Sequence, residues 1–390
     1  MLSRLLPPPP SQTRGLPNLM AALAAAFGAK ANAVPPLPDL PSELMSARTV
    51  ILLVIDGMGE AQLTRHLGDT ILGHCPRMAL DSVFPTTTAT AVGTFLTGVA
   101  PVSHSLTGWH LWSEEIGETV AILPMRRRSS PVPVPEAPQW AERILNVMPF
   151  ADRLPVAVTH VMPAWIAHSP FNLRMAGHVK HQPYGATPDL FTAVERAMAN
   201  QDDRHFIYAY WPDFDTAAHD HGPDAVPAVS RLRAIAAEIE AFAARQAGGD
   251  TVLLVTADHG FITAPTERQI DLVDHPDLVD CLARPLSGER RVAYAHVKPG
   301  RGDYFAETLA ERFGDALWVL DSKSLVDSGW FGRGHLHRHF LSRIGDYTLI
   351  LKDDWTILDT RPGDRHHPMV GMHGGVSEAE MRVPLCWIAL

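Results

Sequence analysis

The stretch TVILLVIDGMG, residues 49–59, decides the fold. Its first seven residues are apolar or β-branched, so no charged side chain marks a solvent-facing side. Such a run predicts a strand that is buried on both faces, as in the parallel sheet of an α/β protein. Asp56 follows directly, where the strand would end. Ligands of parallel sheets gather at the carboxyl ends of the strands, so Asp56 is a candidate site residue; its alternative role is to cap the next helix.

Two other apolar runs lead into polar residues in the same way. Residues 251–255 (TVLLV) are followed by Asp258 and His259, and residues 206–210 (FIYAY) are followed by Asp215. Strand-like and helical patterns alternate along the chain, which predicts an α/β domain with a mostly parallel central sheet flanked by helices. The other expected strands are residues 156–159, 347–351 and 385–389, and the expected helices are residues 88–96, 190–199 and 226–246.

The amino-acid composition limits the classes to which the protein can belong. Of the 390 residues, 46% are hydrophobic and 19% are charged, which is typical of a globular protein with a large core. The formal charge is −10 and no long basic run is present, so a nucleic-acid polymer is not an expected partner. The three cysteines lie far apart, and their spacing supports neither a disulfide framework nor a thiolate metal site.

The N-terminal residues 1–45 are expected to form a helix and a proline-rich linker ahead of one large domain, residues 46–390. An apolar segment, residues 19–29, has basic residues before it and small residues after it, so a signal peptide is the alternative to a core-packing helix. The helix is favoured, and with it a cytoplasmic location rather than export. No apolar run is long enough to span a membrane. Insertions into the large domain are expected near residues 113–138 and 290–343.

Three groups of Asp and His residues could bind metal. Asp215 and His219 are four residues apart, so they can face one ion from a turn or a helix start; an incidental surface turn is the alternative. Asp258 and His259 are adjacent and can converge only from the irregular loop beyond the strand, where the following glycine permits the turn. His373 lies beside two glycines and is either a further ligand or an ordinary loop residue.

Four threonines occur in FPTTTAT, residues 84–90, at the start of an expected helix. Either a hydroxyl caps the helix, or the helix N-terminus stabilises an anion, such as an ionised nucleophile or a phosphate oxygen. A threonine hydroxyl does not ionise unaided at neutral pH, and metal coordination is one way to activate it. Three carboxylates, three imidazoles and one hydroxyl divide into two sites that suit zinc. Two such ions can stabilise both the attacking and the leaving oxygen in a displacement at phosphorus.

Five motifs occur in the order and at the spacing of one family: VILLVIDGMG, FPTTTATAVGTFLTGVAPVSH, DTAAHDHGP, TADHG and MHGG. Through them the chain resembles the nucleotide pyrophosphatase/phosphodiesterase branch of the alkaline phosphatase superfamily, from about residue 49 to the C-terminus. The resemblance implies an alkaline phosphatase-like three-layer sandwich with inserted cap elements. It also implies hydrolysis of phosphodiester or pyrophosphate bonds in a small phosphate ester or nucleotide, through a phosphorylated (nucleotidylated) threonine.

The family motif selects one of the four threonines, Thr88, as the nucleophile, with the Thr97-Gly98 pair nine residues on. The resemblance further implies two divalent metal ions, with Zn²⁺ preferred. One ion would be bound by Asp56, Thr88, Asp258 and His259, and the other by Asp215, His219 and His373.

One position departs from the family pattern. Eukaryotic-type members carry an asparagine about twenty residues after the nucleophile, where it holds a phosphate oxygen, but here Trp109 takes that place and His110 follows. Either side chain could donate to the phosphate, the rings could form a substrate wall, or they could pack in the core. The preference for diesters over monoesters therefore stays open. A phosphonate hydrolase and a phosphomonoesterase are the enzymatic alternatives, and a non-catalytic metal-binding protein is the alternative from another class.

Overall fold

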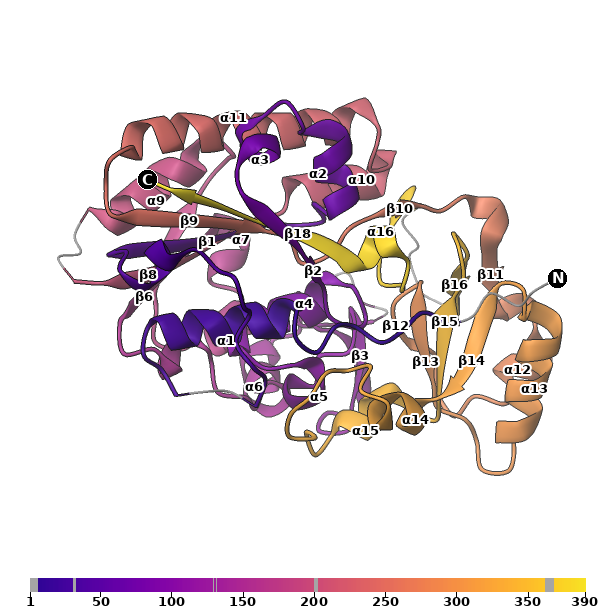
Figure 1. The fold of residues 1–390 in the computed structure, drawn as a ribbon. Helices are drawn as coiled ribbons and strands as arrows, with labels where there is room; N and C mark the ends of the chain where they lie inside the picture. The colour runs from indigo at the N-terminus through magenta and orange to yellow at the C-terminus, as the bar shows by residue number, and fades with distance from the viewer. Residues whose placement is uncertain (1–5, 31–32, 129, 131, 200–202, 362–367) are drawn as a thin grey trace.

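The computed structural model describes residues 6–30, 33–128, 130, 132–199, 203–361 and 368–390, and it contains two large β-sheets (Figure 1). The central sheet has seven strands and runs through the main body. Strand β18 is antiparallel to both of its neighbours, and the other strands are parallel to one another. In order across the sheet they are β2 (Arg77–Asp81), β18 (Arg382–Ala389), β9 (Thr251–Thr256), β1 (Thr49–Ile55), β8 (His205–Trp211), β6 (Ala157–Pro163) and β7 (Lys180–Tyr184).

Strands β1, β8 and β9 form the middle of this sheet, and every residue in them is buried. Their pairing is in register, with Ile55 beside Trp211 and Val54 beside Thr256, so the three strands end at the same edge. The segments that carry the candidate Asp and His residues leave the sheet from this edge. The mostly parallel sheet predicted from the apolar runs is confirmed.

Helices cover both faces of the central sheet and bury it (Figure 1). The long helix predicted at residues 226–246 has the predicted bounds, and the helix predicted at residues 88–96 ends one residue later. The resulting helix–sheet–helix sandwich confirms the expected fold class. On one face lie α1 (Leu16–Ala26), α4 (Thr88–Thr97), α5 (Pro101–His104), α6 (Ala137–Ile144) and α8 (Pro170–Ala176), and on the other α2 (Glu60–His66), α3 (Ile71–His74), α9 (Asp189–Met198), α10 (Asp213–His221) and α11 (Val226–Gln246).

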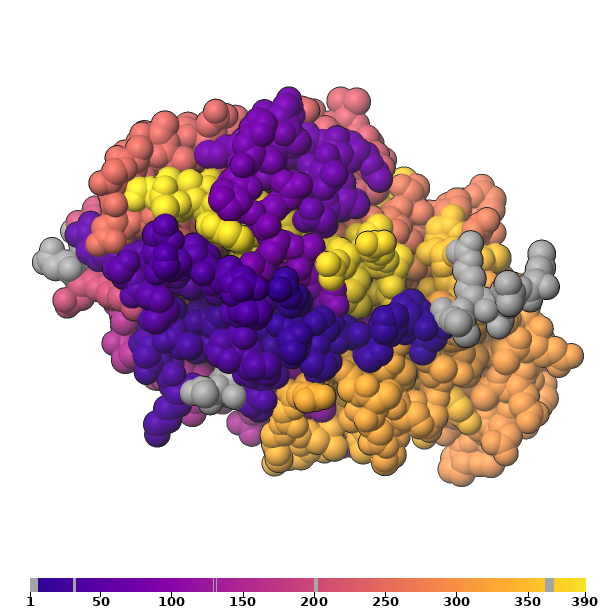
Figure 2. All heavy atoms as spheres, in the orientation of Figure 1, coloured from indigo at the N-terminus to yellow at the C-terminus, as the bar shows by residue number. Residues whose placement is uncertain are grey.

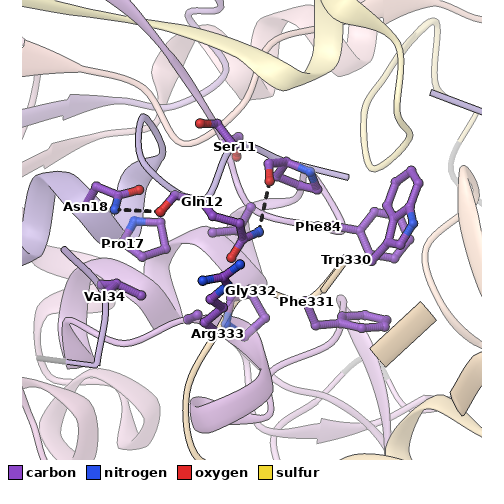
Figure 3. Close-up of a pocket in the computed structure, with 15 residues that line it drawn as sticks. Ser11, Gln12, Pro17, Asn18, Val34, Phe84, Trp330, Phe331, Gly332 and Arg333 are labelled. Carbon is purple, nitrogen blue, oxygen red and sulfur yellow. Dashed lines mark hydrogen bonds between the residues drawn. The ribbon is translucent and has the colours of Figure 1, made fainter. Parts of the chain in front are cut away.

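The N-terminal helix α1 is an integral part of the main core. Leu16, Leu19 and Leu23 are fully buried, and the Asn18 side chain accepts a hydrogen bond from the Gly15 N–H at 3.0 Å. The segment before this helix borders a hollow that is also lined by Phe84 and Trp330 (Figure 3). Its volume, about 20 Å³, has room for roughly one water molecule, so it is not a substrate site. No helix in the described part of the chain is both long and apolar enough to cross a membrane.

The second sheet is antiparallel throughout and forms the lobe coloured mainly orange in Figures 1 and 2. We call residues 110–127 and 287–351, which build it, the cap. Its strands come largely from the two segments where insertions are expected, near residues 113–138 and 290–343, and the strand predicted at residues 347–351 belongs here rather than to the central sheet. The order is β14 (Leu317–Asp321), β15 (Tyr347–Leu351), β13 (Val292–Ala295), β12 (Ser287–Gly288), β3 (His110–Ser113), β4 (Glu118–Ala121) and β5 (Arg126–Arg127).

Several further elements, most of them short, complete the cap, the main body and the connections between them. Two of them, β10 and β17, pair with each other next to the strand-end edge and carry the segment that leads to His373. The remaining elements are β10 (Ile262–Thr263), β17 (Gly371–Met372), β11 (Gln269–Asp271), β16 (Thr356–Leu358), α7 (Ala164–Ala167), α12 (Pro276–Val279), α13 (Gly302–Phe313), α14 (Ser322–Asp327), α15 (Phe340–Ile344), α16 (Glu378–Met381), η1 (Ser42–Met45), η2 (Ala151–Arg153), η3 (Thr266–Arg268) and η4 (Leu272–Asp274).

Candidate active site

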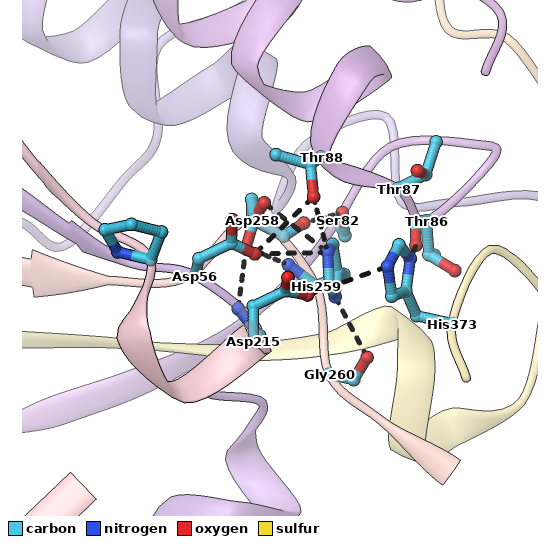
Figure 4. A network of polar contacts seen from close by, with 12 residues as sticks. Asp56, Ser82, Thr86, Thr87, Thr88, Asp215, Asp258, His259, Gly260 and His373 are labelled. Carbon is cyan, nitrogen blue, oxygen red and sulfur yellow. Dashed lines mark hydrogen bonds and ion pairs between the residues drawn. The ribbon is translucent and has the colours of Figure 1, made fainter. Parts of the chain in front are cut away.

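Asp56, Asp258 and His259 form a buried cluster at the carboxyl ends of β1 and β9 (Figure 4). His259 Nε2 lies 3.4 Å from Asp56 Oδ1 and 3.5 Å from Asp258 Oδ2. All three side chains are buried, and their ligand atoms are close enough to share one metal ion. The structure thus brings these three predicted residues together.

The two carboxylates are held by groups from neighbouring strand ends. Asp258 Oδ1 accepts hydrogen bonds from the backbone N–H groups of Gly57 and His259, each at 3.0 Å, and Tyr210 Oη donates to Asp56 Oδ2. The glycine after His259 serves a different purpose from the predicted one. Gly260 does not adopt a positive φ; instead, an added Cβ would lie 2.0 Å from the carbonyl oxygen of Ala379. Gly260 is therefore required for close approach of the backbone, not for a turn.

Asp215, His219 and His373 form a second cluster beside the first. Asp215 and His219 occupy one face of helix α10, and the distance from Asp215 Oδ1 to His219 Nε2 is 3.3 Å. His373 Nε2 lies 3.7 Å from Asp215 Oδ1 and 3.2 Å from His219 Nε2. The rings of His259 and His373 stack at a centroid distance of 3.7 Å, which joins the two clusters.

Backbone carbonyls set which nitrogen of each imidazole faces inward. The Nδ1 atoms of His259, His219 and His373 lie 3.1, 2.9 and 3.2 Å from the carbonyl oxygens of Gly260, Gly371 and Thr86, respectively. Because an Nδ1–H that donates to a carbonyl leaves Nε2 unprotonated, the three Nε2 lone pairs point into the clusters.

These lone pairs face carboxylate oxygens, two of which have no hydrogen-bond donor in the described part of the chain. Asp258 Oδ2 and Asp215 Oδ1 are buried and accept no hydrogen bond from any described residue. The Nε2 atoms of His219 and His373, 3.2 Å apart, would repel each other as two lone pairs. Carboxylate oxygens and unprotonated imidazoles are a donor set that zinc prefers. The residues present therefore fit divalent metal ions in both clusters.

The pKa shifts of these residues reflect burial and the charges of their neighbours. Burial, and then the charges of Asp215 and Asp258, raise the pKa of Asp56 well above its usual value. Burial, and then the neighbouring His259 and His219, lower the pKa of His373 well below its usual value. For His219 burial lowers the pKa, but Asp215 more than offsets this and the net shift is upward. A cation between the carboxylates would relieve their repulsion and favour the ionised forms.

The neighbouring threonines have different partners, and one of them faces the clusters. Thr86 Oγ1 donates to the carbonyl of Gly375 at 2.7 Å, and Thr87 Oγ1 donates to Glu289 Oε1 at 2.6 Å. Thr88 Oγ1 lies 3.1 Å from His259 Nε2 and 3.5 Å from Asp56 Oδ1 (Figure 4). Thr87 is the residue at the helix N-cap, but its side chain does not cap the helix. The hydroxyl beside the two clusters is that of Thr88.

A cavity of about 370 Å³ opens beside the clusters and is large enough for a small-molecule substrate. The central-sheet side contributes Thr88, Asp215, His219 and His373 to its lining. The cap contributes His110, Arg126, Glu289 and Arg290, and Trp109 and Arg128, which directly flank its segment 110–127, line the cavity as well. Trp109 and His110, the two expected substrate contacts, thus line the cavity. Trp112 does not; its ring packs against the Arg284 guanidinium at 3.8 Å.

A family model matches residues 50–376 of this chain, and its description is type I phosphodiesterase / nucleotide pyrophosphatase. The chain belongs to this family. As a member it is a hydrolase of the alkaline phosphatase superfamily that acts on phosphoester bonds, and the family is metal-dependent. No curated protein sequence matches the chain.

Solved structures of two kinds of enzyme share the fold of this phosphodiesterase-family chain. Murine ectonucleotide pyrophosphatase/phosphodiesterase 5 is 19% identical, with a TM-score of 0.65 over 86% of this chain and 87% of that one. A phosphonoacetate hydrolase from Sinorhizobium meliloti, in complex with phosphonoformate, is 17% identical, with a TM-score of 0.62 over 88% and 90% of the two chains. At these identities the likeness shows the fold alone.

Sequence reasoning missed two aromatic residues that shape the site of this phosphodiesterase-family chain. The buried Phe261 ring lies 5.1, 5.5 and 5.2 Å from the rings of His219, His259 and His373, so one side chain packs against all three imidazoles. Tyr210 fixes Asp56, as described above. Phe261 lies two residues after His259 and Tyr210 in the apolar run before Asp215, where both looked like ordinary core residues.

Sequence reasoning also missed the ion pair that holds the His373 loop. Arg291 and Glu380 are fully buried and pair in a bidentate manner, at 3.1 and 3.0 Å. Glu380 Oε1 also accepts from the Gly375 N–H at 2.8 Å, and an added Cβ on Gly375 would come within 2.7 Å of the Glu380 carboxylate. Arg291 comes from the cap and Glu380 from helix α16, so the pair fastens the cap to the loop that carries His373.

Proposed function

We propose that the chain hydrolyses phosphodiester or pyrophosphate bonds through a covalent intermediate on Thr88, with two divalent metal ions, preferably Zn²⁺. The observation that carries this proposal is the position of Thr88 Oγ1. It lies at the N-terminus of α4, 3.1 Å from His259 Nε2, and it borders the substrate-sized cavity. Asp56, Thr88, Asp258 and His259 would hold one ion, and Asp215, His219 and His373 the other.

The proposed reaction has two steps. Thr88 Oγ1 attacks phosphorus, and the bond from phosphorus to the leaving oxygen breaks, which leaves the phosphoryl or nucleotidyl group on Thr88. Water then attacks the same phosphorus from the opposite side and releases Thr88. The partial positive charge at the N-terminus of α4 stabilises the negative charge that develops on Thr88 and on the phosphoryl oxygens.

Bound divalent ions would supply the charge that ionises a hydroxyl at neutral pH and neutralises the phosphoryl oxygens. The residues of the chain position the reacting groups. Carbonyl contacts at Nδ1 orient the three imidazoles, and Tyr210 and the Gly57 N–H orient the two strand-end carboxylates. The structure of an inactive variant of murine ectonucleotide pyrophosphatase/phosphodiesterase 5, made by a threonine-to-alanine substitution, contains AMP. We propose the corresponding role for a threonine here.

The substrate is proposed to be a small anionic phosphate ester or nucleotide. Arg126, Arg128 and Arg290 line the cavity and suit an anionic substrate. A phosphonate hydrolase that cleaves a carbon–phosphorus bond is the second candidate, because the same arginines would also suit an anionic substituent on a phosphonate. This second candidate would be favoured if the enzyme released inorganic phosphate from phosphonoacetate but did not hydrolyse diesters.

The proposal is tested by replacing one hydroxyl in two matched variants, Thr88→Val and Thr90→Val. Both threonines lie on α4 and are buried, but Thr90 Oγ1 has no hydrogen-bond partner among the described residues. We expect two zinc ions in the wild type and loss of bis-p-nitrophenyl phosphate hydrolysis only in Thr88→Val. We also expect an acid-quenched reaction to leave an adduct on the peptide that contains Thr88. Full activity in Thr88→Val, or no hydrolysis of any phosphorus ester by the zinc-loaded wild type, would overturn the proposal.

A further inference from the structure

A carboxyl group from the cap lies next to the residue that precedes the proposed nucleophile. Glu289 follows the short strand β12, and its Oε1 accepts from Thr87 Oγ1 at 2.6 Å and from the Trp109 backbone N–H at 2.6 Å. Glu289 lines the same cavity as Thr88, Asp215 and His373. Glu289 is only partly buried there.

The position of Glu289 bears on the charge of the substrate. Thr87 and Thr88 are consecutive, with Cα atoms about 3.8 Å apart, so a phosphorus atom attacked by Thr88 would lie near the Glu289 carboxylate. The phosphoryl group of a diester or an internal pyrophosphate carries one negative charge. A terminal phosphate carries close to two above its second pKa of about 6. The second charge would be repelled by the carboxylate.

We propose that Glu289 is a specificity-determining residue that favours substrates whose reacting phosphoryl group carries a single charge and disfavours terminal phosphates. The inference rests on the proposed function, because it assigns a substrate class to the same site. Glu289 does not take part in bond making; it acts through its charge beside the reacting phosphorus. It lies next to Trp109, whose backbone N–H it binds, at the position where the sequence left the diester preference open.

The test must be made at a pH at which Glu289 is ionised, because the proposed effect depends on its charge. Burial raises the pKa of Glu289 to about 7, although the hydrogen bonds from Thr87 and Trp109 lower it. Metal ions in the neighbouring clusters would lower it further by favouring the carboxylate. At pH 9 the carboxylate form dominates with or without that effect, so the discrimination is measured there.

The charge of Glu289 can be separated from its hydrogen bonds. Glu289→Gln removes the charge but keeps an oxygen that can accept from Thr87 and Trp109. Glu289→Asp keeps the charge on a shorter side chain. The control is Glu118→Gln, which removes a carboxylate from strand β4 of the same cap; Glu118 pairs with Arg127 at 2.7 Å and does not line the cavity.

The experiment compares kcat/KM for bis-p-nitrophenyl phosphate and p-nitrophenyl phosphate at pH 9 with zinc-loaded enzyme. We expect Glu289→Gln to lower the diester-to-monoester ratio by about fivefold or more, mainly through a lower KM for the monoester. Glu289→Asp should keep most of the wild-type ratio even if its kcat falls, and Glu118→Gln should keep all of it.

An unchanged ratio in Glu289→Gln, or an equal change in Glu118→Gln, would overturn this inference and leave the proposed function standing. If Glu289→Gln does not fold, Glu289→Ala removes the same charge and must show the same fall in the ratio. A wild-type enzyme that hydrolyses neither ester would instead overturn the proposed function itself.

Discussion

The strand-end edge of the central sheet and the cap contribute to one cavity but are built in different ways. At the edge, Asp258 and His259 are completely buried, and backbone groups at the strand ends hold them. On the cap side, Trp109, His110 and Glu289 are partly exposed to the cavity. The two regions therefore contribute different parts of the site. The buried central sheet positions the proposed metal ligands and nucleophile, and the cap forms the wall that a substrate would contact.

Two contacts join these regions close to the site. The buried Arg291–Glu380 pair ties the cap to the His373 loop, and the Glu289–Thr87 hydrogen bond ties it to the start of helix α4. We call these two contacts the joint. Substitutions in the strand-end edge, in the cap and at the joint are therefore expected to have different effects. Changes at the strand ends should abolish chemistry, changes at the joint should cost stability, and changes in the cap wall should alter substrate binding.

The largest effect is expected from Asp258→Asn at the strand-end edge. Loss of one carboxylate from the first cluster should remove one of two bound zinc ions and lower kcat/KM about a thousandfold or more. Asp250→Asn is the matched control, because Asp250 lies at the opposite end of the same strand and binds the Arg48 N–H at 3.1 Å. Metal content by mass spectrometry and diester hydrolysis check the pair. Equal loss of activity in both variants would show a general effect on the sheet.

The next effect is expected at the joint, from Arg291→Met. Removing the guanidinium leaves Glu380 buried without its partner, which should lower the free energy of unfolding by about 3–5 kcal/mol. Because Glu380 also binds the Gly375 N–H, zinc affinity at the His373 cluster should fall as well. Lys323→Met, which breaks an exposed pair with Asp327 within the cap, should leave the free energy of unfolding nearly unchanged. Urea denaturation measures both. A similar loss of unfolding free energy in Arg291→Met and Lys323→Met would contradict a special role for the buried pair.

The strand-end edge was largely predictable from sequence, for a physical reason. A strand buried on both faces has no polar position, so the apolar runs before Asp56 and Asp258 stand out from the rest of the chain. Parallel strands bring their carboxyl ends together whatever their order in the sequence. The family motif then separated Thr88 from its neighbours, and the structure places its hydroxyl beside His259.

The cap was less predictable, because its strands are short and come from distant segments. Strand β12 has two residues and pairs with β3, which precedes it by more than 170 positions, so no local pattern reveals the contact. The same distance hid Glu289, which meets Thr87 and Trp109 only through that pairing. Arg291 and Glu380 lie 89 positions apart, and a buried ion pair carries no sequence signal of its own.

A smaller effect is expected in the cap wall, from Trp109→Ala. The Trp109 side chain lines the cavity but lies outside both clusters, so its loss should raise KM for a diester about tenfold while kcat changes about threefold or less. Trp112→Ala is the control, since Trp112 packs against Arg284 away from the cavity. We expect Trp112→Ala to lower the melting temperature without changing KM. A fall in kcat with constant KM in Trp109→Ala would place that residue in the chemical step instead.

The smallest effect is expected in the pH dependence of stability, and it also separates the two regions. Glu289 has an ordinary pKa of 4.5 and a folded-state pKa of about 7, raised by burial. Between these values the folded state binds more protons than the unfolded state, so the contribution of Glu289 to stability is lost as pH rises from about 4.5 to about 7.

In chelator-treated protein, Glu289→Gln should therefore unfold at the same temperature as the wild type near pH 4.5. At pH 8 it should be the more stable of the two, by roughly 1 kcal/mol. Glu118→Gln, on the exposed side of the cap, should follow the wild type at both pH values. Calorimetry at the two pH values checks this. A constant difference between Glu289→Gln and the wild type would mean that Glu289 ionises in the folded cap as it does in the unfolded chain. Its carboxylate would then be well hydrated, and its charge would act only weakly on a phosphoryl group at Thr88.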